Sequence, residues 1–417
     1  MKPGLRAFST GGWYKDAGRG SQKPENKRLM PLVSVSIRLF SAKQLARDSE
    51  EVAETQAGVA FWRELSYLPQ KQKIMRAMIL SRLTNILENP EPLEIADLPI
   101  PRPGRGEVLA RVRVCGVCHT ELDEIEGRTP PQHLPIVPGH QAIGIVEELG
   151  KGCHLLQVGA RVGVAWIFSA CGECEYCLSG RENLCASFRA TGRDANGGYA
   201  EYMAVPEAFA HPIPSVLGSA EAAPLLCAGA IGYRSVRLAN LKNGQSLGLT
   251  GFGGSGHLVL KMVRHKYPDS RVYVFARSPD ERSFAMSLGA TWVGDTAENP
   301  PEKLDAIIDT TPVWKPVVEA LKALKAGGRL VINAIRKEDT DKGLLQGLDY
   351  PEQLWLEKEV KSVANVTRQD VREFLQLAAE ASIRPEYQEY RLEEANQALY
   401  GLKTQKIRGA KVLRIEE

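Results

Sequence analysis

The sequence predicts an α/β protein in which an irregular, mostly β domain precedes a doubly wound domain built on a parallel sheet. At 417 residues the chain is longer than one ordinary hydrophobic core, so we expect two main domains. Short stretches of alternating apolar and polar residues, broken by frequent Gly and Pro, fill residues 75–225 and are typical of irregular β structure. After Cys227, short apolar runs alternate with helical patterns, which indicates parallel strands joined by helices.

The first 74 residues differ in composition from the rest of the chain. They carry 13 Lys and Arg against 7 Asp and Glu, a net charge of +6, whereas the other 343 residues carry 40 against 43. We interpret residues 1–74 as an N-terminal extension that is disordered or not native to the folded protein, because Met75 opens a strand-like run over residues 75–80. A targeting peptide is the alternative, since such segments are rich in Arg and Ser.

Residues 75–227 form the predicted first domain, in which alternating stretches mark the strands. Two strands are expected over residues 108–114 and 142–148, and a third strand signal follows a glycine turn over residues 197–205. The same domain contains a cysteine-rich lobe over residues 171–185.

The lobe reads C-x2-C-x2-C-x7-C, and its cysteines are Cys171, Cys174, Cys177 and Cys185. Four thiolates at this spacing can close a tetrahedral shell around one Zn²⁺ without an open position, as in a structural site. Disulfide pairs are the alternative, which the reducing cytosol expected for this protein disfavours. Outside the lobe three candidate ligands remain for a second metal: Cys118, His140 and Cys227.

The predicted second domain, residues 228–363, alternates strands with helices. Its strands are expected over residues 246–250, 271–276, 304–309 and 329–333. Its helices are expected over residues 257–265 and from Asp280 and Lys315. Residues 364–417 follow with helices near 370–381 and 392–402 and a strand over 410–415, and we expect this tail to return to the first domain.

A glycine-rich loop joins the first strand of this domain to its first helix. Its G-x-G-x-x-G pattern is formed by Gly251, Gly253, Gly254 and Gly256. Glycines in this setting permit a tight turn and let the backbone approach a pyrophosphate at the helix N-terminus. We therefore expect a dinucleotide site here rather than only a flexible loop.

The end of the next strand favours NADP(H) over NAD(H). Folds that bind NAD carry an Asp or Glu about 20 residues past the glycine loop, where this chain has Ala276. Arg277 offers a cationic fork suited to the 2′-phosphate, with Ser278 as a second donor and Arg282 one helical turn on. Asp280 is the competing acid, but an acid after Pro279 is expected to begin the next helix.

Five motifs follow one another between Met75 and Glu417. They are Cys115-Gly-Val-Cys118-His-Thr-Glu, Pro138-Gly-His140-Gln, the cysteine lobe, Leu226-Cys227-Ala-Gly and Gly251-Phe-Gly-Gly-Ser-Gly-His257. In this order they resemble the zinc-dependent, medium-chain alcohol dehydrogenases. The resemblance implies a GroES-like catalytic domain, a Rossmann cofactor domain and two Zn²⁺ per chain. It also implies that Cys118, His140 and Cys227 hold a catalytic zinc, which would polarise an alcohol oxygen so that hydride can leave.

The same resemblance implies roles for nearby polar residues. Thr120 would pass the alcohol proton outward, and Asp123 stands where many relatives carry a relay histidine. His119 would lie near the cofactor phosphates, and Arg368 would reach the pyrophosphate from the tail.

Three other positions bear on the same family pattern. Glu121 stands where relatives have the acid that orients the ligand histidine. Gln141 replaces a glutamate that follows this histidine in relatives. Trp166 stands where a related branch has a tryptophan in its substrate pocket, and an ordinary core position is the alternative.

Composition argues against two classes of protein. No apolar run reaches the roughly 18 residues of a membrane helix, and residues 75–417 have a net charge of −3, too acidic for a nucleic-acid surface. With the resemblance given above, which implies a homodimer or homotetramer acting on a small alcohol or aldehyde, we predict a cytoplasmic oxidoreductase. The alternatives are a zinc-dependent polyol or sugar dehydrogenase and a zinc-stabilised interaction module, which would hold one zinc instead of two.

Overall fold

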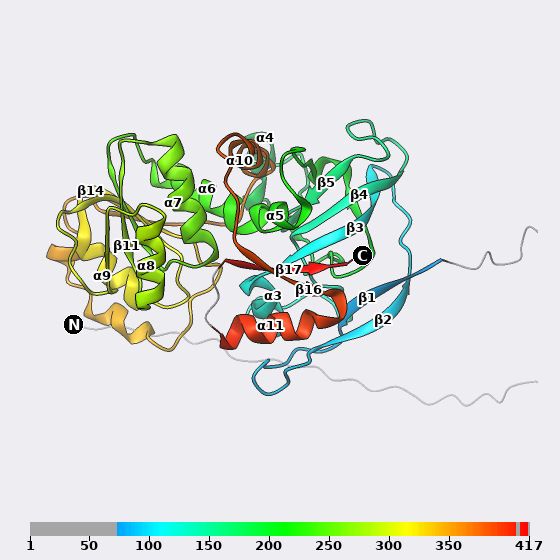
Figure 1. Ribbon diagram of the computed structural model, residues 1–417, viewed down its shortest axis with the longest axis horizontal. Helices are drawn as coiled ribbons and strands as arrows, with labels where there is room; N and C mark the ends of the chain where they lie inside the picture. The colour runs from blue at the N-terminus through cyan, green and yellow to red at the C-terminus, as the bar shows by residue number, and fades with distance from the viewer. Residues whose placement is uncertain (1–72, 406–408, 416–417) are drawn as a thin grey trace, which may run out of the picture. The chain divides into compact units, whose positions relative to one another are not determined.

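The structure, a computed structural model, describes residues 73–405 and 409–415 (Figure 1). The described residues all belong to one compact unit, Lys71–Glu417. The extension predicted over residues 1–74 therefore lies outside the described residues, except for its last two positions. Ile74 already belongs to the first strand, β1 (Ile74–Leu80), which pairs antiparallel with β2 (Leu93–Pro99).

A seven-stranded sheet combines five strands from residues 107–212 with two strands from the tail. Its strands lie in the order β16-β17-β3-β4-β5-β9, and β8 pairs with β3 beside this path. Their bounds are β3 (Glu107–Val117), β4 (Ala142–Leu149), β5 (Arg161–Val164), β8 (Tyr202–Pro206), β9 (Ala210–Pro212), β16 (Tyr387–Arg391) and β17 (Ala410–Arg414). The strands predicted over residues 108–114 and 142–148 are confirmed as β3 and β4.

The strand predicted over residues 197–205 is shorter in the structure. Only β8 joins the ladder, because the backbone N–H groups of residues 197–199 donate instead to carbonyls of residues 137–139. These bonds tie the glycine turn to the loop before β4, and that loop carries His140.

Short elements surround this sheet, and five of the seven candidate ligands lie inside them or cap them. The helices are α3 (His119–Ile125), α4 (Glu175–Leu178) and α5 (Ser219–Pro224), and the tighter or wider turns are η1 (Glu182–Leu184), η2 (Glu207–Phe209) and η3 (Leu225–Gly229). A two-stranded ladder of β6 (Ile167–Ser169) and β7 (Arg189–Ala190) flanks the cysteine lobe.

Residues 246–362 form a six-stranded parallel sheet, in the order β12-β11-β10-β13-β14-β15. Its strands are β10 (Ser246–Thr250), β11 (Arg271–Phe275), β12 (Trp292–Gly294), β13 (Leu304–Asp309), β14 (Leu324–Ile332) and β15 (Glu359–Ser362). Counted from β10, this is the 3-2-1-4-5-6 order of the Rossmann fold. All five residues of β10 are buried, as expected for a central parallel strand.

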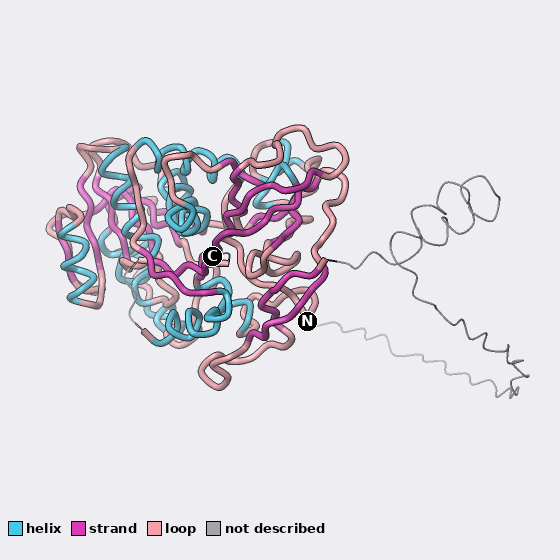
Figure 2. The backbone as a smooth tube through the Cα atoms, turned by 45° about the vertical axis from the view of Figure 1, so that its right-hand side comes forward, coloured by secondary structure: helices cyan, strands magenta, loops and turns pink. Residues whose placement is uncertain are grey.

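Helices are layered against this sheet, as Figure 2 shows. They are α6 (Ala230–Ala239), α7 (Gly254–Lys266), α8 (Pro279–Ser287) and α9 (Lys315–Ala323), with the turns η4 (Lys342–Gly347) and η5 (Tyr350–Leu354) before β15. The strand and helix alternation predicted after Cys227 is therefore confirmed.

The tail contributes two strands to the first sheet. It consists of α10 (Arg368–Glu380), the turn η6 (Leu392–Glu394) and α11 (Ala395–Thr404), in addition to β16 and β17. Strand β17 pairs antiparallel with β3, so the end of the chain lies beside the strand that leads to Cys118 (Figure 1). Among the described residues, no helix combines the length and the apolar character needed to cross a membrane.

Candidate active site

Three side chains that are distant in sequence converge beside the first sheet. Cys118 follows β3 and caps α3, His140 precedes β4, and Cys227 lies in the wide turn η3. Their ligand atoms all lie within 4.8 Å of one another, and Cys118 Sγ is 3.5 Å from His140 Nε2. A tetrahedral zinc shell separates its ligand atoms by about 3.5 Å, so this set fits the metal.

The loop that carries His140 depends on a glycine. Gly139 has a φ of +99°, and a Cβ there would lie 2.3 Å from the ring of Tyr199. Both the backbone conformation and the close ring exclude other residues at this position. This loop conformation places the imidazole of His140 next to Cys118, where it is fully buried.

Glu121 fixes the orientation of His140. Its Oε1 accepts from His140 Nδ1, while its Oε2 accepts the backbone N–H of Cys118 at 2.9 Å. Since Nδ1 donates to the carboxylate, the lone pair of Nε2 is left to face Cys118 and a metal. The role predicted for Glu121 therefore has its geometry in place.

The thiols of the triad need a cation to be held as thiolates. The Cys227 thiol, followed by burial, raises the pKa of Cys118 well above its ordinary value. Thiols ligate zinc in the deprotonated form, and the positive charge of the metal stabilises that form. The donor set is that expected of a catalytic site, with three protein ligands and one position left for substrate.

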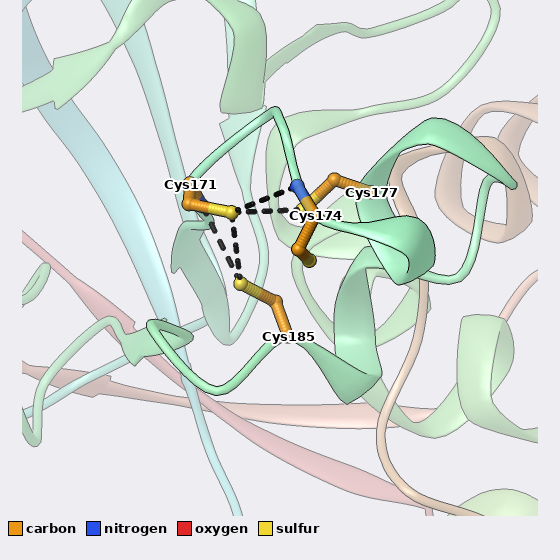
Figure 3. A group of neighbouring side chains, drawn as sticks. All are labelled: Cys171, Cys174, Cys177 and Cys185. Carbon is orange, nitrogen blue, oxygen red and sulfur yellow. Dashed lines mark hydrogen bonds between the residues drawn. The ribbon is translucent and has the colours of Figure 1, made fainter.

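The four lobe cysteines form a second cluster (Figure 3), and their sulfur atoms also lie within 4.8 Å of one another. Cys171 Sγ is 3.5 Å from Cys185 Sγ and 3.8 Å from Cys177 Sγ, well beyond the 2.05 Å or so of a disulfide bond. All eight cysteines of the chain lie in the described residues and are free. The backbone N–H groups of Glu173 and Cys174 lower the pKa of Cys171 to about 6, which favours the thiolate that zinc requires.

The glycine loop has the geometry of a phosphate site. Gly251 has a φ of +80°, and a Cβ there would lie 2.8 Å from Thr310 Oγ1. A Cβ on Gly256 would lie 2.8 Å from the carbonyl oxygen of Gly251, so this glycine permits the tight turn into α7. In contrast, nothing lies within 4 Å of a Cβ on Gly253 and nothing closer than 3.8 Å to one on Gly254, which leaves the backbone open to a ligand.

Comparison with known proteins agrees with this geometry. Residues 104–215 match the family model described as the alcohol dehydrogenase GroES-like domain. A probable alcohol dehydrogenase of Mycobacterium tuberculosis, AdhA, is 42% identical over 329 residues, which cover 78% of this chain and 93% of that protein. The chain belongs to the zinc-dependent, medium-chain alcohol dehydrogenases.

Two further relatives extend the comparison. An alcohol dehydrogenase of Geobacillus stearothermophilus is 34% identical over 338 residues, covering 78% of this chain and 96% of that protein. A structure of a zinc-binding dehydrogenase from Sinorhizobium meliloti bound to NADP has a TM-score of 0.72 and 25% identity, covering 82% of this chain and all of that one. The dehydrogenase described here is accordingly an enzyme that uses zinc and a nicotinamide cofactor.

The predicted relay residues of the dehydrogenase lie on α3. Thr120 is half-buried in the first turn, directly after the exposed His119. Asp123 is buried, and its Oδ1 accepts from Arg128 Nε at 2.5 Å. The relay roles of Thr120 and Asp123 stay predictions, and a proton that reaches Asp123 would have to compete with the guanidinium of Arg128.

The end of β11 carries the predicted cofactor residues. Ala276 is buried, Arg277 is exposed, and the buried hydroxyl of Ser278 has no hydrogen-bond partner among the described residues. Arg282 Nη1 donates to the carbonyls of Ala276 (2.7 Å) and Arg277 (3.1 Å), so it holds the strand end in place and does not extend into solvent. Asp280 lies in the first turn of α8, as predicted.

Arg368 has a partner that the sequence did not reveal. Its Nε lies 3.0 Å from Glu182 Oε1, and its guanidinium carbon lies 4.9 Å from the centre of the Phe209 ring. Its predicted contact with the cofactor pyrophosphate stays a prediction.

Two buried polar groups near the site could not be recognised from the motifs. Glu124, which accepts from Trp166 Nε1 at 3.0 Å, lies four residues after Thr120, and that helical spacing was the available signal. Lys337 pairs with the buried Asp309 at the end of β13 and also donates to the carbonyl of Thr311 at 2.7 Å. No local pattern links these partners in the sequence.

Proposed function

We propose that this dehydrogenase interconverts a small alcohol and the corresponding aldehyde or ketone with NADP(H) as the hydride carrier. The observation that carries the proposal is the convergence of Cys118, His140 and Cys227, whose ligand atoms lie within 4.8 Å of one another. Zn²⁺ bound by these three residues would supply the Lewis acid that polarises the oxygen of the substrate.

In this proposal the protein side chains orient the metal site and handle the proton. Glu121 keeps His140 Nε2 free to ligate, because its carboxylate accepts from Nδ1. The hydroxyl of Thr120 accepts the proton of the alcohol and passes on its own, since a hydroxyl both donates and accepts. Asp123 is the proposed next acceptor, and reaching it requires competition with Arg128.

The cofactor is proposed to lie across the carboxyl ends of the parallel strands. Gly251, Gly253, Gly254 and Gly256 would admit its pyrophosphate at the N-terminus of α7, assisted by His119 and Arg368. Arg277 and the unpartnered hydroxyl of Ser278 would bind the 2′-phosphate. The absence of an acid at the end of β11, among the described residues, supports NADP(H) over NAD(H).

Cys171, Cys174, Cys177 and Cys185 are proposed to hold a second, structural zinc, which gives two zinc ions per chain. We also propose a catalytic domain over residues 75–227, a cofactor domain over 228–363 and a return to the catalytic domain over 364–417. A homodimeric or homotetrameric assembly, a cytoplasmic location and no nucleic-acid partner complete the proposal.

Metal analysis combined with an activity panel tests this function. The purified protein should contain about two zinc ions per chain and should reduce at least one member of a panel of aldehydes and ketones, with NADPH preferred to NADH. Sorbitol and xylitol belong in the oxidative panel, because activity on them alone would favour a polyol dehydrogenase. A protein that contains one zinc ion per chain and turns over no substrate would refute the proposed activity, and only the fold assignment would remain.

A further inference from the structure

Trp166 follows β5, and the candidate ligand His140 precedes its neighbour β4. The ladder between β4 and β5 is antiparallel, with Ile143 opposite Gly163 and Ala142 opposite Val164. His140 lies two residues before β4 and Trp166 lies two residues after β5, so both residues leave this ladder at the same end. Trp166 and the candidate ligand His140 therefore flank the same end of one strand pair.

Helix α3 brings Glu124 to the same place. Cys118 caps this helix, Thr120 is in its first turn, and Glu124 follows Thr120 by four residues, which places the two on one helical face. Glu124 is only 1% exposed, and its Oε1 accepts the indole N–H of Trp166 at 3.0 Å.

The indole is also held from other directions. The ring of Phe188 lies 5.4 Å from that of Trp166, and the guanidinium carbon of Arg193 lies 5.1 Å from its centre. Arg193 is itself fixed by two hydrogen bonds to Asp194, at 3.0 and 2.7 Å. The Trp166 ring has contacts on its faces, so the hydrogen bond at its edge decides how it is rotated.

The side chain of Glu124 makes no other hydrogen bond among the described residues, and the charged groups that interact with it are Glu121, His140 and Arg193. Among the described residues its Oε2 is buried without a hydrogen-bond partner, and no ion pair involves it. Burying a carboxyl group in this way is costly, and the indole N–H is the group that it satisfies. A leucine would fill the same space at lower cost if packing alone were needed.

We infer that Glu124 is a positioning residue that fixes the indole of Trp166 as a wall of the alcohol site and thereby sets which substrates fit. This inference depends on the proposed function, because it assigns a specificity device to that same site. Glu124 acts through Trp166, so it alters the relative rates of small and bulky alcohols more than it alters hydride transfer.

The test uses the zinc-loaded, full-length protein and four variants. E124L removes the acceptor, E124Q keeps an oxygen for the indole N–H, W166F removes the donor, and E124L/W166F removes both. E126Q is the matched control, because Glu126 lies two residues away and binds Arg128 and Lys403 rather than Trp166. Zinc content is measured for every variant.

Two readouts separate positioning from general damage. The first is the ratio of kcat/KM for a bulky alcohol to that for a short one, which E124L should shift by about tenfold while E124Q and E126Q leave it near the wild-type value. The second is the NMR resonance of the Trp166 indole N–H, identified by its absence in W166F. In E124L this proton should move and exchange faster with water.

The double variant gives the decisive result. If Glu124 acts through Trp166, E124L changes nothing further in the W166F background. An unchanged selectivity ratio and indole resonance in E124L, or an equal shift with and without Trp166, would overturn the inference. A wild-type protein that oxidises no alcohol with either nicotinamide would instead overturn the proposed function.

Discussion

Glu182 accepts two hydrogen bonds from Arg368, one from its backbone N–H at 2.9 Å and one from its Nε at 3.0 Å. Glu182 opens the turn that leads to Cys185, and Arg368 is the first residue of α10. Next to it, Asn183 Nδ2 donates to the carbonyl of Ala364 at 2.6 Å. The cysteine lobe is thus bound directly to the segment by which the chain leaves the parallel sheet.

Replacing Glu182 should weaken this attachment. Burial raises the pKa of Glu182, but the bonds from Arg368 overcome this and hold it below its ordinary value, so the carboxylate is charged. We expect E182Q to lower the free energy of unfolding by about 1–3 kcal/mol, because a charge-assisted bond is lost in a largely buried site. Urea denaturation measures this, with the exposed Glu175 of the same lobe as a control in E175Q. Equal stability of the two variants would contradict the expectation.

Removing the acid behind His140 should loosen the catalytic metal. Glu121 uses both oxygens, one for His140 Nδ1 and one for the Cys118 N–H. In E121Q we expect zinc affinity at this site to fall by about 10- to 100-fold, because the ring is no longer held by a charged acceptor. Zinc retained against rising chelator concentration measures the change, and E126Q provides the control. Identical zinc release from wild type and E121Q would argue against this role.

The two cysteine clusters should respond differently to the loss of one thiol. C227S should abolish turnover and leave the lobe zinc in place, whereas C174S should mainly lower stability, because a closed zinc shell contributes folding energy. C153S is the control for both, since Cys153 belongs to neither cluster and its Sγ bonds the carbonyl of Glu107. Full activity in C227S would refute the catalytic assignment, and a wild-type melting curve for C174S would refute the structural one.

How far the sequence could predict this molecule depends on the distance over which each feature is encoded. The short, mainly apolar segments at residues 246–250 and 304–309 predict strands with the bounds that β10 and β13 have, because a buried strand leaves a short segment of this kind between turn residues. The lobe is equally evident, since all four cysteines fall within residues 171–185. The local sequence pattern is thus sufficient to predict both the strands of the parallel sheet and the cluster of four cysteines.

Contacts between distant segments could not be read in this way. Cys118, His140 and Cys227 are brought together in the sequence by resemblance alone, and the structure supplies the distances. The pairs of Arg368 with Glu182 and of Trp166 with Glu124 join residues 186 and 42 positions apart. Periodicity describes one element at a time, so it cannot identify the partner of a buried polar group on another element.

A buried histidine should make stability depend on pH. His211 in β9 is 1% exposed, and burial, with the charges of Arg372 and Arg368 acting in the same direction, lowers its pKa to about 3. Below about pH 6.5, His211 binds a proton in the unfolded chain but not in the folded chain. Its burial therefore costs no free energy of unfolding above that pH, and the free energy of unfolding falls as pH decreases below it. Between the folded and unfolded pKa values of His211, the free energy of unfolding should fall by up to about 1.4 kcal/mol for each pH unit.

Denaturation between pH 7 and pH 4 measures this effect in wild type and in H211L, which cannot bind the proton. The slope of the free energy of unfolding against pH measures how many more protons the unfolded chain binds. In H211L this number should be smaller than in wild type by up to one proton. H133N is the control, since His133 is exposed. Parallel pH profiles for wild type and H211L would show that His211 is protonated in the folded protein.

The choice of nicotinamide should be controlled by the end of β11. Arg277 is exposed there, Ser278 presents a buried hydroxyl without a partner among the described residues, and Ala276 stands where an acid would hold the ribose of NAD. The double variant A276D/R277A should therefore reverse the preference, because it adds a carboxylate that repels the 2′-phosphate and removes the cation that attracts it. Each charge-assisted bond is worth about 1.5–3 kcal/mol, so the ratio of kcat/KM for NADPH to that for NADH should fall by at least about tenfold.

Two single variants complete this test. S278A should weaken NADPH binding and leave NADH unaffected, because only the phosphate ester would use the hydroxyl. D280N should change neither cofactor, since Asp280 is exposed in the first turn of α8, where an acid favours the helix dipole. Dissociation constants from the quenching of protein fluorescence give both comparisons without a substrate. A wild-type protein that binds NADH more tightly than NADPH at moderate salt, or a D280N variant that loses NADH, would assign the ribose to Asp280 instead.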